Sequence, residues 1–307
     1  MSTCNCRHLL SCHFLHYIRI ILAFDGKEFY NVYKILLTVG TFRLYIFCYT
    51  EAFVAMKLHV LETEKELGQV AADLIAEGLI SAINEKGEAN YLVSTGSSQF
   101  TTFEALIANK NIDWTKVTMY HLDEYVDLPE SHIASFRKYL KERFVSKVPL
   151  KKAVFVNGEG DIEENLRMLE EELAAHPIDV GAIGIGENGH IAFNDPPALF
   201  EKEGAYHVVN LNDTCKKQQV GEGWFATVDD VPKQAISMTC SQIMKCKLIV
   251  CAVPGERKAD AICNTLRIDT PDPMVPATLL KLHPATHVVV DAGSASKCDE
   301  TLIKKFS

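Results

Sequence analysis

Two patterns of apolar residues alternate along the chain from residue 56 onward. Short, mainly apolar runs are typical of strands buried in a parallel sheet, and the chain has them at 91–94, 117–122, 180–185 and 248–253. Between such runs, apolar residues recur every three or four positions, as in 67–79, which predicts amphipathic helices. The alternation predicts a doubly wound, Rossmann-like α/β fold, with a mostly parallel open sheet and helices on both faces.

Weaker signals predict the remaining elements. Thr63 and Glu66 have the spacing of a capping box at the start of the first helix. Further helices are expected over 100–108 and 163–174 and from Pro254 onward, and further strands over 153–156, 208–211, 235–239 and 286–290. Residues 212–234 are polar and lack a clear period, so they predict a long irregular loop. Long loops in compact domains are often functional, and here we expect a lid.

Residues 1–55 differ from the rest of the chain. They are rich in aromatic and aliphatic residues, with apolar stretches at 14–24 and 35–54 that charged residues interrupt. Neither stretch supplies the roughly 20 clean apolar residues of a membrane span. We predict that 1–55 is an atypical N-terminal extension outside the functional protein, with a targeting role as the alternative. Residues 56–307 then form a single α/β domain with the lid near 212–234.

Composition and charge narrow the classes of function. The chain has 307 residues, 48% of them hydrophobic, and a formal net charge of -9. That length allows a large core, and the charge argues against a nucleic-acid partner. The ten cysteines are scattered, without the spacing of a zinc site or of a disulfide framework. We therefore predict a cytoplasmic protein with reduced thiols and without a metal.

A glycine-rich loop with a histidine carries the first candidate site. The apolar strand that ends near 185 breaks at Gly186 and Gly189, and His190 follows, with Asp195 five residues further on. A histidine beside a carboxylate can move protons near neutral pH. Such a loop at the carboxyl edge of an open sheet is a typical ligand site. A purely structural role for a histidine in a glycine turn is the alternative interpretation.

A second loop has the features of an anion site. Thr95, Gly96, Ser97, Ser98 and Gln99 stand between a predicted strand and the N-terminus of a predicted helix. Free backbone N–H groups and the helix dipole favour an anion there. The loop lacks the lysine of a nucleotide P-loop and the dinucleotide fingerprint. A polar turn that only caps the helix would have the same pattern.

Two sequence signatures resemble those of a known family. Residues 186–196 read Gly-Glu-Asn-Gly-His-Ile-Ala-Phe-Asn-Asp-Pro, and residues 122–129 read Leu-Asp-Glu-Tyr-Val-Asp-Leu-Pro. Both closely resemble signatures of the glucosamine-6-phosphate deaminase (isomerase) family, and Ser131, His132, Ser135 and Phe136 continue the second match. The resemblance extends over about residues 57–300.

The resemblance implies a reaction and roles for particular residues. The expected reaction converts glucosamine 6-phosphate and water to fructose 6-phosphate and ammonia, in amino-sugar catabolism and without a cofactor. His190 would open the sugar ring with Asn188 and Asp195 beside it, and Asp123 would take the proton from C2. The loop Thr95–Gln99, Gly189 and Lys258 would bind the sugar phosphate. Without the resemblance, Lys258 would be interpreted as a solvated helix residue.

The chain also departs from the family pattern. Asn188 stands where many relatives have aspartate, and Asp195 stands where they have glutamate. Ser98-Gln99 replaces a usual Thr-Pro, and Gly223 occupies the position of an arginine that contacts the phosphate in many members. Lys216 and Lys217 lie nearby in sequence as candidate replacements. These changes leave the amino sugar open more than the type of reaction.

Two other functions remain as alternatives. A 6-phosphogluconolactonase belongs to the related branch, but Ile191-Ala192-Phe193-Asn194 differs from the Gly-His-Thr-Ala-Ser type of continuation found there. A non-catalytic sugar-phosphate sensor is the second, although 1–55 shows no helix-turn-helix pattern. We expect a small-molecule sugar phosphate as the partner and neither nucleic acid nor membrane. A homo-oligomer is a possible assembly.

Overall fold

The computed structural model describes residues 21–23, 32–39, 42–49 and 56–307. The chain divides into two units, Met1–Phe53 and Val54–Ser307. In the first unit, strands β1 (Ile21–Ala23), β2 (Val32–Val39) and β3 (Phe42–Tyr49) form an antiparallel sheet in that order. Most of the predicted stretch 14–24, and residues 50–55 at the predicted boundary, lie outside the described residues. Among the described residues, no helix combines the length and the apolar character that crossing a membrane requires.

The second unit is built on a sheet of seven strands, and every neighbouring pair in it is parallel. The order is β4 (Lys57–Leu61), β13 (Thr286–Asp291), β12 (Leu248–Val253), β9 (Val180–Ile183), β5 (Ala89–Val93), β6 (Val117–His121) and β8 (Lys152–Val154). The chain runs outward from β5 to β6 and β8, and then from β9 to β12 and β13 on the other side. The order therefore reverses between β5 and β9, where ligands bind in open α/β sheets. The predicted fold class is confirmed.

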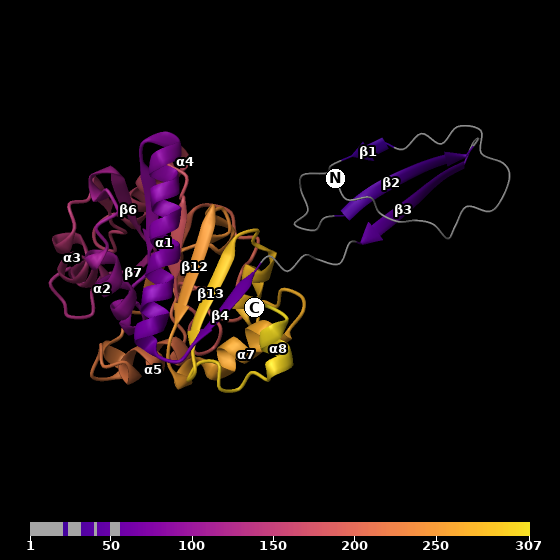
Figure 1. Ribbon diagram of the computed structural model, residues 1–307. Coiled ribbons are helices and arrows are strands. Elements are labelled where there is room, and N and C mark those ends of the chain that lie inside the picture. The colour runs from indigo at the N-terminus through magenta and orange to yellow at the C-terminus, as the bar shows by residue number, and fades with distance from the viewer. Residues whose placement is uncertain (1–20, 24–31, 40–41, 50–55) are drawn as a thin grey trace. The chain divides into compact units, whose positions relative to one another are not determined.

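Successive side chains of each strand enter two different core layers. Tyr91 and Val93 lie in one layer and Leu92 in the other, and Val250 and Ile249 are divided in the same way. The first layer is covered by α1 (Glu64–Lys86), α2 (Phe100–Ala108) and α3 (Phe136–Arg143). The second is covered by α4 (Ile162–Ala175), α6 (Cys240–Ile243), α7 (Ala259–Arg267) and α8 (Glu300–Lys304). Helix α1 contacts both β12 and β13, and Figure 1 shows it running alongside these strands.

The longest helix begins as the sequence predicts. Thr63 Oγ1 accepts from the Glu66 N–H at 3.2 Å, and the Glu66 carboxylate accepts from the Thr63 N–H at 3.0 Å. This reciprocal capping box satisfies two helix-end donors. The helix ends at Gly87 with a φ of 85°, a left-handed conformation in which glycine has no steric penalty. Both ends of α1 are therefore fixed by local sequence.

A small antiparallel sheet lies in the second unit as well. It contains β10 (Tyr206–Asn210), β11 (Gln234–Met238) and β7 (Asp123–Tyr125), in that order. Asp123 follows shortly after the end of β6 and is the first residue of β7, where it pairs with Ser237. Residues from this sheet bury an aromatic cluster that includes Tyr125 and Phe225.

The prediction of an irregular loop over residues 212–234 is wrong. The segment contains α5 (Asp213–Gly221) and a short 3-10 helix, Val228–Asp230. Asn212 caps α5 by accepting from the Cys215 N–H at 2.8 Å. Cys215 and Gln219 are both buried, four residues apart on one side of the helix. The buried positions are a cysteine and a glutamine, so the amphipathic pattern is not visible as an apolar stripe.

Candidate active site

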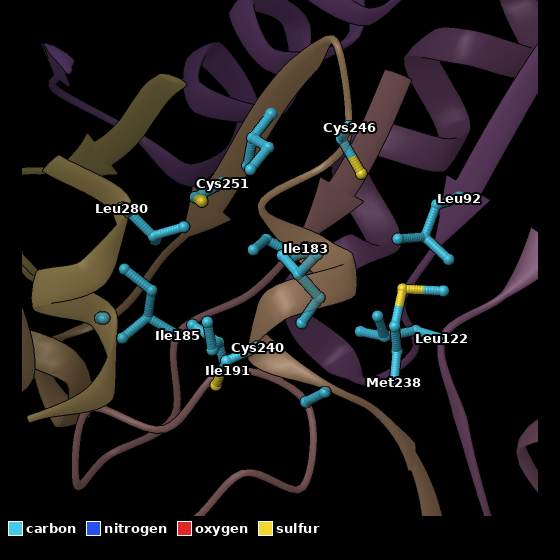
Figure 2. Packing of buried hydrophobic residues seen from close by; sticks show 14 of the residues in the cluster. Leu92, Leu122, Ile183, Ile185, Ile191, Met238, Cys240, Cys246, Cys251 and Leu280 are labelled. Atoms are coloured by element: carbon cyan, nitrogen blue, oxygen red, sulfur yellow. The ribbon is translucent and has the colours of Figure 1, made fainter. Parts of the chain in front are cut away.

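An open cavity lies at the carboxyl ends of β5 and β9, where the strand order reverses. Four predicted elements of the site line it: the loop from Thr95 to Ser98, Asp123, His190 and Lys258. Ile183, Ile185 and Ile191, which flank the glycine-rich loop, are buried in the core layer beneath (Figure 2). The loop that carries His190 is therefore anchored on both sides by apolar packing.

A short chain of polar contacts holds the His190 ring. His190 Nδ1 lies 2.7 Å from Asn188 Oδ1 and 3.3 Å from Asp195 Oδ1, and Asn188 Nδ2 donates to Asp195 Oδ1 at 2.9 Å. Because both oxygens are acceptors, Nδ1 carries the proton in the neutral ring, which leaves Nε2 as the nitrogen that accepts protons. Burial alone would raise the pKa of Asp195, but its contacts with His190, Asn188 and Cys215 outweigh burial and lower it.

Gly186 makes room for the imidazole. A Cβ atom on Gly186 would come within 2.1–2.3 Å of three atoms of the His190 ring. Any side chain at this position would displace the ring, since such contacts are far inside van der Waals distance. Gly189 has a φ of 84°, and its N–H donates to the Gly186 carbonyl at 3.0 Å. The two glycines therefore form the turn that places His190 at the cavity.

Asp123 and Glu124 have different surroundings although they are adjacent. Glu124 is buried and accepts hydrogen bonds from Ser135 Oγ, from backbone N–H groups of residues 125, 136 and 137, and from Arg137 Nε. It has a structural role. Asp123 is 6% exposed, lines the cavity, and has no hydrogen-bond partner for its carboxylate among the described residues. Burial, with a smaller contribution from Glu124, raises the pKa of Asp123 to about 8. A carboxylate with such a pKa is suited to general base catalysis.

Two similar strand-to-helix connections meet at the cavity. After β5, Gly96 (φ 103°) leads into the 3-10 turn Ser97–Gln99 and then α2, and after β12, Gly255 (φ 92°) leads into Glu256–Lys258 and then α7. Both connections direct helix N-termini toward the cavity edge, where backbone N–H groups favour an anion. Burial lowers the pKa of Lys258, and the nearby Glu222 and Glu187 carboxylates oppose that change.

Other predicted residues lie behind the cavity wall. Gln99 is 1% exposed, and its side chain donates to Ser98 Oγ at 3.2 Å. A Cβ atom on Gly189 would come within 3.0 Å of Val275, and Gly189 does not line the cavity. Asn188 and Asp195 contact His190 but do not line the cavity. The assignment of these residues to the site stays a prediction.

The residues that the sequence interpretation missed come from α5 and the turn after it. Gln218, Gln219, Glu222 and Trp224 line the cavity, whereas Lys216 and Lys217 do not. The suggested replacement of the family arginine by those lysines therefore lacks support from their position. Two signals in the sequence could have indicated a helix here: Asn212 as its N-cap, and the four-residue spacing of Gln218 and Glu222. Between residues 56 and 307, no three His, Cys, Asp or Glu side chains gather as metal ligands.

Comparisons with known proteins agree with this geometry. Residues 62–290 match the family described as glucosamine-6-phosphate isomerases/6-phosphogluconolactonase. The chain is 34% identical, over 248 residues, to a glucosamine-6-phosphate deaminase of Bacillus cytotoxicus, which covers 80% of this chain and 91% of the relative. A glucosamine-6-phosphate deaminase of Streptococcus equi subsp. equi is also 34% identical, over 80% of this chain and 100% of the relative.

Solved structures give the same result for the fold. The structure of a monomeric glucosamine-6-phosphate deaminase aligns with a TM-score of 0.72 and 30% identity, over 79% of this chain and 100% of that one. A 6-phosphogluconolactonase from Trypanosoma brucei aligns with a TM-score of 0.66 at 15% identity, over 79% and 98% of the two chains, and shares the fold alone.

The reversed strand order, the glycine-containing turn before α2 and the His190 contacts are typical of an enzyme of the Rossmann-like α/β class. More narrowly, the chain belongs to the family of glucosamine-6-phosphate isomerases and 6-phosphogluconolactonases. The predicted family and the prediction of an enzyme are both confirmed.

Proposed function

We propose that the protein is a glucosamine-6-phosphate deaminase, which converts glucosamine 6-phosphate and water to fructose 6-phosphate and ammonia. One observation carries the proposal: the Asp123 carboxylate and the His190 imidazole line the same cavity as Lys258 and the Thr95–Ser98 loop. The reaction needs two proton-transfer groups and a phosphate anchor, and this cavity supplies all three. The curated relatives of similar sequence carry the same name.

Ring opening is the step that fits His190. The closed sugar must lose a proton from O1 and gain one at the ring oxygen. With Nδ1 held by Asn188 and Asp195, Nε2 can accept the first proton and return it to the ring oxygen. The imidazolium that forms between these transfers lies beside the Asp195 carboxylate, which stabilises its charge.

Proton transfer at C2 fits Asp123. In the open-chain aldehyde, Asp123 removes the C2 proton and the C2 electron pair forms the C1=C2 double bond. O1 takes a proton from the substrate ammonium as its carbonyl bond opens, which gives an enolamine. Return of a proton to C1 gives a C2 imine, to which water adds as ammonia leaves. The substrate ammonium, when it is close to Asp123, favours the ionised carboxylate that this step requires. Phosphate binding at the loop and Lys258 holds C2 in position.

The test is ammonia release from a panel of sugar phosphates. Glucosamine 6-phosphate, its 4-epimer, its 2-epimer and 6-phosphogluconolactone would be incubated with the purified enzyme. We expect ammonia and fructose 6-phosphate from the first compound, with no catalysed opening of the lactone. Turnover of the lactone without any ammonia release from the amino sugars would contradict the proposal.

Location and assembly are also part of the proposal. The six cysteines described in the second unit are free thiols, which supports a reducing compartment such as the cytoplasm. We expect no nucleic-acid partner, because the net charge is -9. Sedimentation analysis would decide between a monomer and a homo-oligomer.

A further inference from the structure

Gly223 stands at the position where many members of the family have an arginine. Gly223 has a φ of 83°, and a Cβ atom placed on it would have no atom within 4 Å. Glycine supplies no guanidinium at this position. The end of α5 and the turn after it instead place four polar or aromatic side chains at the cavity, and hydrogen bonds hold each of them. We call these four residues the α5 wall: Gln218, Gln219, Glu222 and Trp224.

Gln219 presents an oriented amide. Its Oε1 accepts a hydrogen bond of 2.7 Å from the hydroxyl of Tyr125, which is fully buried. This contact directs Nε2 away from Tyr125, and none of the described groups accepts from Nε2. Gln219 is 6% exposed and lines the cavity. The amide therefore supplies a donor whose orientation is set before any ligand binds.

Glu222 presents an oriented carboxylate. Its Oε1 accepts from Gln218 Nε2 at 2.8 Å, and its Oε2 accepts from Trp224 Nε1 at 3.2 Å. A carboxylate oxygen can accept more than one hydrogen bond, so both oxygens retain capacity for a ligand. The ring of Trp224 lines the cavity beside this carboxylate.

A fixed amide donor, a fixed carboxylate acceptor and an indole face match the chemistry of a sugar ring. Hydroxyl groups donate to carboxylates and accept from amides, and the C–H face of the ring packs on an aromatic surface. We propose that Gln219 and Glu222 bind ring hydroxyl groups of the amino-sugar phosphate, and that this wall determines which hydroxyl configuration is accepted. The inference rests on the proposed function, because the sugar phosphate must occupy this cavity.

A competing account gives Glu222 a purely electrostatic role. Its carboxylate lies close enough to Lys258 to favour the charged ammonium, as does Glu187. Glu187 pairs with Arg257 at 2.7 Å and does not line the cavity with Asp123 and His190. Glu187→Gln is therefore the matched control, since it removes a charge near Lys258 without altering the wall.

The decisive experiment combines enzyme variants with deoxy substrates. kcat/KM would be measured for glucosamine 6-phosphate and its 3-deoxy and 4-deoxy analogues, with wild type, Glu222→Gln and Glu187→Gln. A hydrogen bond to a charged group predicts a loss of roughly 10- to 150-fold for Glu222→Gln on the full substrate. For wild type and for Glu187→Gln, we expect kcat/KM of one deoxy analogue to be lower than that of glucosamine 6-phosphate by a similar factor. For Glu222→Gln, removing the same hydroxyl should lower kcat/KM little further, because its partner is already absent.

The same set of kcat/KM measurements with Gln219→Glu tests the role of Gln219 Nε2 as a hydrogen-bond donor. That substitution keeps an oxygen for the Tyr125 hydroxyl and removes the Nε2 donor. Equal losses on all three substrates for both variants would overturn the proposal. A fall in KM for every phosphorylated substrate in Glu222→Gln would also overturn it, because the carboxylate would then act only against the phosphate charge.

Failure of the proposed function has a separate signature. If wild type releases no ammonia from glucosamine 6-phosphate, the deaminase assignment fails, whether or not Gln219 and Glu222 bind hydroxyl groups. Calorimetry would then measure the affinities of the same three sugar phosphates for wild type and the variants, which tests the hydroxyl contacts without turnover. The same non-additive pattern of affinities supports the hydroxyl contacts, and additive losses overturn them.

Discussion

Asp123 and His190 open into one cavity, but their surroundings prepare them for different steps. The His190 ring is held at Nδ1 by Asn188 and Asp195, so its proton acceptor is fixed in direction. Asp123 is buried without a partner for its carboxylate among the described groups, so its free energy of ionisation is high. One residue has a fixed orientation and the other an altered acidity, and each property suits its proposed step.

Variants of these two residues should therefore fail at different steps. Asp123→Asn removes the base and should abolish both ammonia release and exchange of the C2 proton with solvent, by roughly 10²- to 10⁴-fold. His190→Gln should lose activity on the cyclic substrate but recover much of it on an analogue locked in the open-chain form. The measurements are C2 deuterium exchange and turnover on both substrates. Wild-type exchange in Asp123→Asn would show that another group is the base.

The raised pKa of Asp123 predicts how activity depends on pH. Burial first, and then Glu124, raise the pKa of this carboxyl to about 8, so the base is largely protonated in the free enzyme at neutral pH. log(kcat/KM) should therefore rise by about one per pH unit up to roughly pH 8 and then level off. Profiles corrected for ionisation of the substrate would show this limb, and a plateau that begins near pH 5 would contradict it.

Linkage gives the same group an effect on folding that needs no substrate. A carboxyl with a raised pKa binds its proton more tightly in the folded state, so its contribution to stability is lost as pH rises from about 4 to about 8. Asp123→Asn lacks this loss. The difference in free energy of unfolding between Asp123→Asn and wild type should therefore grow over that range.

At the scale of elements, local signals predicted the fold well. The helix over 100–108 and the strand over 248–253 have the predicted bounds, because each is set by a glycine-containing turn and a clear apolar pattern. The Gly-His loop also lies where predicted, at the carboxyl edge of the sheet. These features depend on residues close together in sequence.

Features that depend on distant contacts could not be predicted in the same way. Strand β7 exists because it pairs with β11, more than 100 residues later, and Glu124 is structural because α3 supplies its donors. Helix α5 buries Cys215 and Gln219, which do not form an apolar stripe. The cavity wall it forms was missed for the same reason.

The N-terminus of α7 and Lys258 form one half of the proposed phosphate site. Lys258→Ala removes a cation that lines the cavity and should raise KM for the 6-phosphorylated substrate by roughly 10- to 150-fold, because a hydrogen bond to a charged group contributes about 1.5–3 kcal/mol. kcat should change less, since the lysine binds away from the reacting carbon.

Lys216→Ala on α5 is the matched control, because Lys216 does not line the cavity. Steady-state kinetics of both variants would test the assignment. Equal changes in KM for the two lysine variants would remove Lys258 from the phosphate site and return Lys216 to consideration.

At the scale of the whole molecule, the net charge of -9 does not attract an anionic substrate. The cavity compensates locally, with Lys258, two helix N-termini and the serine-rich loop at one edge. Binding energy for the phosphate must therefore come from short-range hydrogen bonds, which ionic strength screens less than a long-range field.

The last prediction concerns residues 1–55. The family match begins at residue 62, and 80% of this chain covers 100% of the Streptococcus relative. The unit from Val54 onward has its own core, and Leu58 in β4 donates to the Phe306 carbonyl at 2.7 Å, which ties its two ends together. A chain beginning at Met56 should therefore be folded and should keep wild-type kcat and KM. Thermal unfolding and kinetics of both chains would test this, and loss of folding or of activity in the shorter chain would show that residues 1–55 belong to the functional protein.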